Sequence, residues 1–323
     1  MKSTYNSRVF GSVILGRINV KRKIRLRQKN NLELMAMSVI PLCVLICFSY
    51  IPMIGLILAF KNFNYVGGIF GSPWCGFNNF KFLFANSDVM RITKNTLILN
   101  LLFIFTTTAG GVIFAIILNE IRSKTALKIY QTCIFLPYIL SASIVAYVVF
   151  SLLNADYGLI NAMLKKAGRE AILWYSEPKY WYAILVLTNF WKGIGYSTII
   201  YFASVISIDG SYYEAATIDG ANWLQSHRYV TIPMIMPMVI TLTIMNVGHV
   251  FYSDFGLFYM VPKNTGALYP ATDVIDTYVY RALSDGDFGK SAAVGLYQSL
   301  VGFILVFVAN RLAKSYDKNS AIF

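Results

Sequence analysis

Charged residues are scarce in this sequence. Asp, Glu, Lys and Arg make up only 13% of the 323 residues, whereas apolar residues make up 57%. The mean hydropathy is +0.57. A water-soluble globule ordinarily carries about 25% charged residues, which cover its surface. The composition therefore excludes a soluble protein and predicts one that lies in a lipid bilayer.

Potential metal ligands are also few, with four cysteines and two histidines in the chain. Three of the cysteines lie in strongly apolar runs, and none forms a metal-ligand cluster with His227 or His249. We therefore expect no structural disulfide, no metal and no bound cofactor. The sequence also offers no intramembrane carboxylate pair and no nucleophile with a base, which argues against a membrane enzyme.

Long apolar runs are what the sequence has in place of charge. About 20 apolar residues cross the hydrocarbon layer as a helix, and six stretches qualify. They are residues 34–60, 96–118, 129–153, 181–206, 231–251 and 292–313. Prolines in or at the ends of these runs, Pro137 among them, are expected to kink the spans without ending them. We predict an all-α integral membrane protein with six transmembrane helices, whose residues 34–313 form a single membrane domain.

Basic residues are unevenly distributed between the two sides that these spans define. With the N-terminus inside, the inner segments 1–33, 119–128, 207–230 and 314–323, together with Arg311 at the end of the last span, carry a net charge of +10, against +3 outside. The positive-inside rule then places both termini in the cytoplasm. The basic arm over residues 1–33 adjoins the first span, so contact with anionic lipid explains its charge better than nucleic acid does. We interpret the arm and first span as a retained anchor, because the apolar run is too long for a signal peptide.

The outer connections, residues 61–95, 154–180 and 252–291, are long and rich in aromatic residues. Trp74 and Phe77 are examples from the first of them. Such aromatic residues either form a belt at the lipid–water interface or provide a docking surface for an external protein.

The inner loop between spans four and five, residues 207–230, is the most informative segment. Glu214, Ala215 and Ala216 favour a short helix, and Gly220, with Asp219 beside it, is expected to end that helix. Glu214 is expected at the start of the helix, where the helix dipole favours a carboxylate. A second helix then enters the membrane. The pair is either a lever that passes displacement to a span or an ordinary amphipathic connector.

A family resemblance favours the lever. Glu214-Ala215-Ala216, three residues, Gly220, nine residues and then Val230-Thr-Ile232-Pro233 resemble the cytoplasmic signature of permeases of ATP-binding cassette (ABC) importers. Other stretches resemble the carbohydrate-uptake, maltose-transporter-like branch, especially permeases for oligosaccharides and polysaccharide fragments. These stretches are residues 119–124, 131–132, 136–138, 191–196 and 273–280. The likeness runs from about residue 34 to the C-terminus.

This resemblance implies a bacterial cell-membrane assembly with several partners. They would be a second homologous permease subunit, two cytoplasmic ATPase subunits that receive the Glu214 loops, and an external substrate-binding lipoprotein or periplasmic protein. ATP and Mg would be bound in the partner subunits, because this chain has no Gly-x-x-x-x-Gly-Lys-Ser/Thr phosphate loop. The solute would be a sugar. Alternatives are another solute, such as glycerol phosphate or an amino-sugar, and an ion-coupled secondary transporter, for which Lys192 alone makes no charge relay.

Polar and aromatic side chains inside spans four and five are the candidate substrate contacts. Sugars need aromatic faces for their C–H surface and amide, hydroxyl or ammonium groups for their hydroxyls. The candidates are Asn189, Trp191, Lys192 and Tyr196 in span four and Asn246, His249 and Tyr252 in or just beyond span five. Inter-helix hydrogen bonding explains the Asn and His residues equally well. Lys192 would contact an anionic sugar or pair with Asp254.

Thiol labelling of whole cells tests the predicted topology. In a background without the native cysteines, Ser72→Cys, Ser176→Cys and Thr265→Cys should react with a membrane-impermeant maleimide, because all three lie in outer connections. Reaction of Ser123→Cys or Ser226→Cys in intact cells would reverse the assignment of sides.

Overall fold

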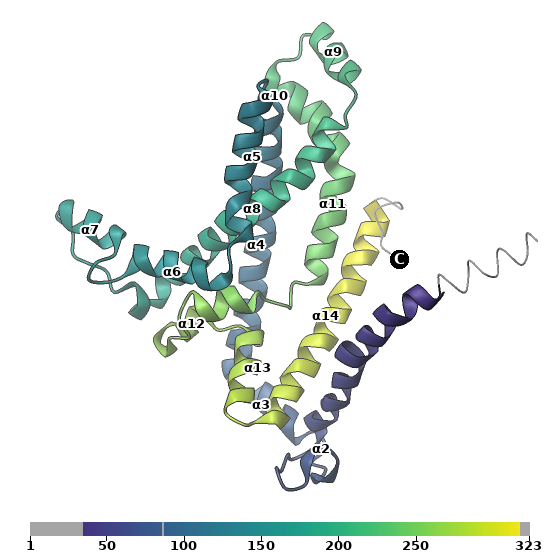
Figure 1. Ribbon diagram of the computed structural model, residues 1–323, viewed down its shortest axis with the longest axis vertical. Helices are drawn as coiled ribbons and strands as arrows, with labels where there is room; N and C mark the ends of the chain where they lie inside the picture. Colours follow the sequence, from purple (N-terminus) through teal and green to yellow (C-terminus); the bar gives the residue numbers. More distant parts are fainter. Residues whose placement is uncertain (1–34, 86, 317–323) are drawn as a thin grey trace, which may run out of the picture. The chain divides into compact units, whose positions relative to one another are not determined.

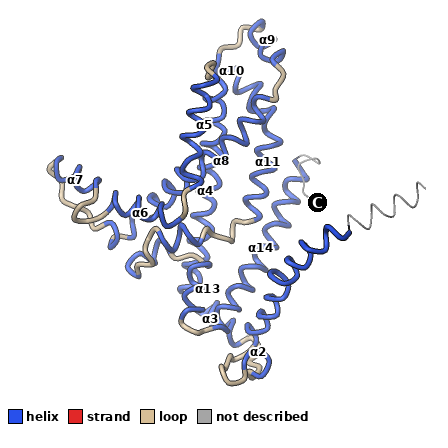
Figure 2. The backbone as a smooth tube through the Cα atoms, viewed as in Figure 1, coloured by secondary structure: helices blue, strands red, loops and turns tan. Residues whose placement is uncertain are grey.

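The computed structural model describes residues 35–85 and 87–316. The chain divides into two compact units between Ile57 and Leu58, and each is described by itself. Helices make up most of the described chain, with loops between them (Figures 1 and 2). Apart from an isolated bridge between Lys61 and Trp74, the described residues form no strand. The basic arm, residues 1–33, lies outside the described residues, as does most of the C-terminal tail.

The described part of the N-terminal unit is an apolar helix, which belongs to the helical segment Met35–Phe60. Its middle is a π-helical turn, η1 (Ile46–Tyr50), and its end is a 3₁₀ helix, η2 (Ile51–Phe60). The change falls at Pro52, whose ring has no N–H to donate and crowds the preceding turn. The best window of this helix has a mean hydropathy of 2.5, as the first predicted span requires.

The second unit contains the remaining elements. Its long helices are α4 (Ser87–Asn119), α5 (Lys124–Ile139), α6 (Ala142–Leu153), α8 (Trp181–Ile206), α11 (Ile232–Gly248) and α14 (Phe288–Tyr316). Its shorter α-helices are α2 (Gly68–Gly71), α3 (Asn78–Ala85), α7 (Leu159–Lys166), α9 (Gly210–Ile218), α10 (Trp223–Ser226), α12 (Tyr269–Thr272) and α13 (Ile275–Ser284). Its π and 3₁₀ turns are η3 (Trp174–Ser176), η4 (Pro178–Tyr180), η5 (His227–Thr231), η6 (Gly256–Met260) and η7 (Gly266–Leu268).

Five helical segments of the described chain are long and apolar enough to cross a membrane. They are Met35–Phe60, Asp88–Asn119, Pro178–Ile206, Trp223–Gly248 and Phe288–Arg311. Several extend beyond the predicted bounds because the helix continues through polar residues that the apolar count leaves out.

The third predicted span, residues 129–153, is not one continuous helix. It consists of α5 and α6, which meet at an angle of 98°, so six spans result only if this bent pair counts as one. The helix ends after Pro137 because Leu140 and Ser141 are extended, with ψ of 136° and 153°. The Ser141 side chain then accepts a hydrogen bond from the Ile144 amide and so caps the start of α6. The helix thus ends near Pro137 instead of continuing through a kink, although α5 and α6 together can still form one span.

Within the second unit, α8 packs against both α4 and α5 (Figure 1). The contact with α5 is close: a Cβ on Gly195 would lie 2.2 Å from the carbonyl oxygen of Ile134, so only glycine fits there. An apolar cluster that includes Leu99, Trp181 and Leu257 joins α4, α8 and η6. α14 packs against α11 and α13. These contacts fix the middle of α8, where four of the candidate residues lie.

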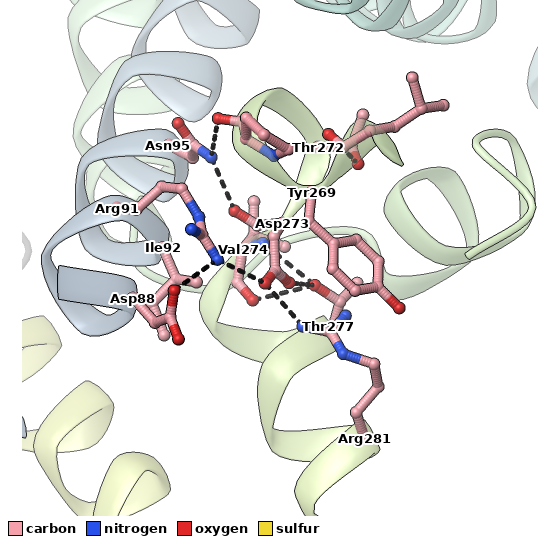
Figure 3. A network of polar contacts seen from close by, with 12 residues as sticks. Asp88, Arg91, Ile92, Asn95, Tyr269, Thr272, Asp273, Val274, Thr277 and Arg281 are labelled. Atoms are coloured by element: carbon pink, nitrogen blue, oxygen red, sulfur yellow. Dashed lines mark hydrogen bonds and ion pairs between the residues drawn. The ribbon is translucent and has the colours of Figure 1, made fainter. Parts of the chain in front are cut away.

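A polar network joins the start of α4 to α12 and α13 (Figure 3). Its centre is the carboxylate of Asp273, whose side chain is only 1% exposed. Arg281 Nη2 lies 2.6 Å from Asp273 Oδ2, and Arg91 Nη2 of α4 lies 3.9 Å from the same oxygen. Thr277 Oγ1 donates to Asp273 Oδ1 at 2.8 Å. Asn95 of α4 donates to the backbone carbonyl of Asp273 at 3.0 Å. The network therefore anchors the outer connection that leads to the last span.

The start of the first predicted outer connection, residues 61–95, is a loop that is held by hydrogen bonds and presents aromatic residues. Lys61 is buried, and its Nζ donates to the carbonyls of Ile69 and Phe70 at 3.1 and 2.6 Å. Tyr65, Phe70 and Trp74 remain largely exposed. Ser72 is buried and donates to the Gly68 carbonyl. Ser72→Cys is therefore a poor labelling site, whereas Ser176 is exposed.

Removing the central carboxylate of the network should destabilise the fold. Asp273→Asn leaves the Arg281 guanidinium without its anion in a mostly buried place, and such a loss costs about 3 kcal/mol. The purified protein should therefore melt at a lower temperature in detergent. Glu177→Gln is the matched control, because the Glu177–Lys179 pair is exposed and should matter little. Equal melting temperatures for the two variants would contradict the anchoring role.

Candidate functional site

A cavity of about 270 Å³ lies at the middle of α4 and α8 and reaches the end of α5 and the end of α11. It brings together five of the seven residues that the sequence proposes as substrate contacts. These are Asn189, Tyr196, Asn246, His249 and Tyr252. The spacings along two separate spans thus place these side chains around one space.

Lys192 and Trp191 do not line this cavity. Lys192 Nζ lies 3.2 Å from Asp254 Oδ2, which agrees with pairing, the second of the two expectations for this lysine. Trp191 is 40% exposed. The prediction that Trp191 and Lys192 contact substrate stays a prediction.

The cavity also contains polar residues that the sequence analysis left out, namely Asn100, Thr107, Tyr138 and Ser197. Asn100 lies in the middle of a span, and an intramembrane amide is itself a signal for such a site. Tyr138 follows Pro137 at the end of α5 and stacks on Tyr196, with ring centroids 4.9 Å apart and planes 14° apart. Only the packing of α5 on α8 brings these two rings together.

The lining suits a solute with both hydroxyl groups and an apolar face. Within the described chain, no hydrogen bond occupies the side chains of Asn189, Asn246 or Tyr196, so their polar groups are available. The Tyr138–Tyr196 stack supplies a flat apolar surface. The described residues hold no cluster of three or more His, Cys, Asp or Glu side chains that could bind a metal ion. Binding here would depend on amide and hydroxyl hydrogen bonds and on ring contact.

The turn after α11, which carries three of the lining residues, is held by side chains of other helices. Asn100 Nδ2 donates to the Val250 carbonyl at 2.8 Å. Gln298 of α14 donates to the Phe251 carbonyl at 2.6 Å. The Ser253 amide donates to Asp276 Oδ2 of α13 at 2.7 Å. Burial raises the pKa of the Asp276 carboxyl, against the lowering effect of the hydrogen bonds that Gln298 and the Ser253 amide donate to it. The cavity wall is therefore fixed from three sides.

The loop between spans four and five forms the predicted helix–turn–helix (α9 and α10 in Figure 1). Asp209 caps α9 by accepting from the Ser211 amide, and this hydrogen bond lowers the pKa of the Asp209 carboxyl. Gly220 ends the turn with φ of +78°, a conformation that favours glycine. The Ala221 amide donates to the Ala216 carbonyl at 2.9 Å and the Gly220 amide to the Thr217 carbonyl at 3.1 Å, which is a Schellman motif.

Glu214 lies in the middle of α9, so its predicted place at the helix start is wrong. The helix begins four residues earlier because Asp209 provides a better cap, and its first turn holds no acidic residue. The helix dipole therefore does not account for Glu214. Glu214, Ala215, Asp219 and Gly220 are exposed, Ala216 is half-buried, and α9 has no buried residue. The helix is a protruding, exposed element on which Ala215 and Ala216 adjoin Glu214 (Figure 1).

Comparison with known proteins agrees with this arrangement. Residues 107–318 match the model of the family described as "Binding-protein-dependent transport system inner membrane component". The polygalacturonan/rhamnogalacturonan transport system permease protein YteP of Bacillus subtilis (strain 168) is 36% identical over 92% of this chain and 93% of its own length. Protein LplB of the same organism is 34% identical over 84% of this chain and 85% of its own length.

Solved structures are similar as well. One chain comes from the crystal structure of a bacterial ABC transporter involved in the import of the acidic polysaccharide alginate. It has a TM-score of 0.82 and 31% sequence identity, over 90% of this chain and 97% of that chain. A second comes from the complex with an alginate pentasaccharide-bound periplasmic protein and has a TM-score of 0.81. The family model matches residues 107–318, and one relative is 36% identical over 92% of this chain. This chain therefore belongs to the family of binding-protein-dependent transport system inner membrane components, the permease subunits of ABC importers.

Proposed function

We propose that this permease forms, together with a second homologous permease subunit, the translocation pathway for an oligosaccharide. The midspan cavity carries the proposal: its free amides and stacked tyrosines match the hydroxyls and C–H faces of sugar rings. The names of the similar proteins support the same solute class, because they concern polygalacturonan, rhamnogalacturonan and alginate.

The partners and the energy source belong to the same proposal. Two cytoplasmic ATPase subunits bind ATP and Mg and receive the exposed α9 helices, while this chain itself catalyses no reaction. An external binding protein delivers the sugar to the outer connections. The chain lies in the bacterial cytoplasmic membrane with both termini in the cytoplasm, in accord with the excess of basic residues on the inner segments.

Reconstitution of the complete complex tests this function. ATP hydrolysis is measured in proteoliposomes with the binding protein, using galacturonate, alginate and maltodextrin oligomers as probes. An oligosaccharide importer should hydrolyse ATP faster with at least one loaded binding protein and should accumulate that oligomer. Accumulation by this chain in the absence of ATPase subunits would instead support a secondary transporter.

The cavity assignment predicts different effects for Tyr196 and Trp191, two of the aromatic residues of α8. Tyr196→Ala removes half of the stacked pair and should reduce uptake about fivefold, because a lost ring contact costs about 1 kcal/mol. Tyr196→Phe keeps the stack and should retain most of the transport. Trp191→Ala should have the smaller effect, because Trp191 does not line the cavity. If Tyr196→Ala transports normally and assembles normally, the sugar binds elsewhere.

The α9 assignment predicts a loss of coupling. Glu214→Lys reverses an exposed charge, and Gly220→Val strains a turn whose φ is +78°. Either change should abolish uptake and reduce the amount of ATPase that copurifies, while the binding protein still binds sugar.

Gly168→Val is the matched control for that experiment. Gly168 has φ of +73° and open space around its Cα, as Gly220 has, but it follows α7 on the outer side. Its replacement should leave the association with the ATPase unchanged. Normal uptake by both α9 variants, with the ATPase still bound, would mean that the loop is only a connector.

A further inference from the structure

A buried histidine lies where α9, the start of span five and the end of α4 meet. His227 is 5% exposed, and Thr231 is fully buried. His227 Nδ1 lies 2.8 Å from Thr231 Oγ1, and His227 Nε2 lies 3.1 Å from Glu120 Oε1. Thr231 Oγ1 also lies 2.9 Å from the hydroxyl oxygen of Tyr213, which precedes Glu214 on α9. Four side chains thus form one continuous hydrogen-bonded chain.

The donor and acceptor roles along this chain are mutually consistent. An ionised Glu120 only accepts, so His227 Nε2 carries the donated hydrogen. In a neutral imidazole Nδ1 is then the acceptor, and the Thr231 hydroxyl donates to it. That hydroxyl has only one hydrogen, so it accepts from Tyr213. Every donor in the chain has one acceptor, and each bond depends on the next.

Little else holds α9 to the membrane helices. None of its residues is buried. Within the described chain, the Tyr213–Thr231 bond is the one hydrogen bond between an α9 side chain and another helix. A cavity of about 320 Å³ lies beside the bond, with Asn119 and Glu120 on one side and Tyr213 and Thr217 of α9 on another. Close packing therefore does not transmit displacement of α9 to the end of α4.

Two residues of this hydrogen-bonded set, His227 and Thr231, lie in an irregular helical turn at the start of span five. His227 and Thr231 are the first and last residues of η5, a π-helical turn in which the Ile232 amide donates to the His227 carbonyl. Single π-helical turns are rare in proteins overall, and those that occur are often found at functional sites. Trp223 packs edge-on against the His227 ring, with ring centroids 4.5 Å apart, and fixes the orientation of the imidazole.

We propose that Tyr213, Thr231, His227 and Glu120 act as positioning residues that transmit displacement of α9 to the cytoplasmic ends of spans two and five. The inference rests on the proposed coupling of α9 to an ATPase and identifies the route by which coupling enters the membrane domain. Breaking one hydrogen bond among these four side chains should uncouple transport while the ATPase stays bound. Damage to the exposed surface of α9 should instead reduce binding of the ATPase.

The test uses the complete reconstituted complex, titrated with the binding protein loaded with whichever oligomer stimulates the unaltered complex most. Tyr213→Phe and Thr231→Val each remove one hydroxyl and should lower the maximal stimulated rate of ATP hydrolysis about fivefold. The half-saturating concentration of binding protein, the unstimulated rate and the amount of copurified ATPase should not change. Thr231→Ser keeps the hydroxyl and should restore stimulation.

Control variants distinguish loss of a hydrogen bond among these four residues from general damage to the protein. Tyr229→Phe and Thr241→Val make the same chemical changes nearby, at an exposed tyrosine and at a threonine that bonds only within α11, and should have no effect. The double variant Tyr213→Phe/Thr231→Val should be no worse than Thr231→Val alone, because Thr231→Val already removes the bond that Tyr213→Phe breaks.

Three results would overturn the proposal that these four residues transmit displacement of α9. They are full stimulation in Tyr213→Phe, losses that multiply in the double variant, and equal losses in the controls. In each of these cases the unaltered complex still responds to loaded binding protein, so the proposed function survives. If no oligomer stimulates the unaltered complex, the proposed function and the relay fall together.

Discussion

Irregular backbone in this chain depends on amide side chains that donate to its carbonyl oxygens. Asn79 donates to carbonyls at the end of η2, Asn95 to one in α12 and one just after it, and Asn161 to those on both sides of α7. Asn100 and Gln298 do the same for the turn after α11. Since an unsatisfied carbonyl in or near hydrocarbon is costly, these amides make the non-helical segments possible.

The same constraint distinguishes the cavity from the rest of the molecule. Asn189 and Asn246 have the same side chain as Asn100, yet within the described chain no hydrogen bond occupies their amides. Polar groups of this kind are tolerated in a span when they face water or a solute. Amides that hold the backbone and amides that have no hydrogen bond in the described chain thus lie within one cavity wall, where the first kind holds the turn that presents His249 and Tyr252.

The two functional elements differ in how they are held. The cavity is fixed by packed helices, a close α5–α8 contact at Gly195 and a network of buried polar groups. The α9 helix is shaped locally by Asp209 and Gly220 and is joined to the spans mainly through Tyr213. Under the proposed function the cavity has to keep its shape while α9 follows a partner, and the difference in attachment suits that division.

Apolar composition, five of the spans and the helix–turn–helix of the inner loop followed from sequence, because helix length in a bilayer and glycine at a positive φ are local requirements. The break between α5 and α6 did not, since Pro137 allows a kink as well as a break, and the cap at Ser141 decides between them. Spacing along α8 grouped Asn189, Lys192 and Tyr196, but only tertiary structure separated Lys192, which pairs with Asp254. Tyr138, Asn100 and the chain from Tyr213 to Glu120 join residues distant in sequence. Their roles follow from which helices pack together, which a pattern along one helix does not determine.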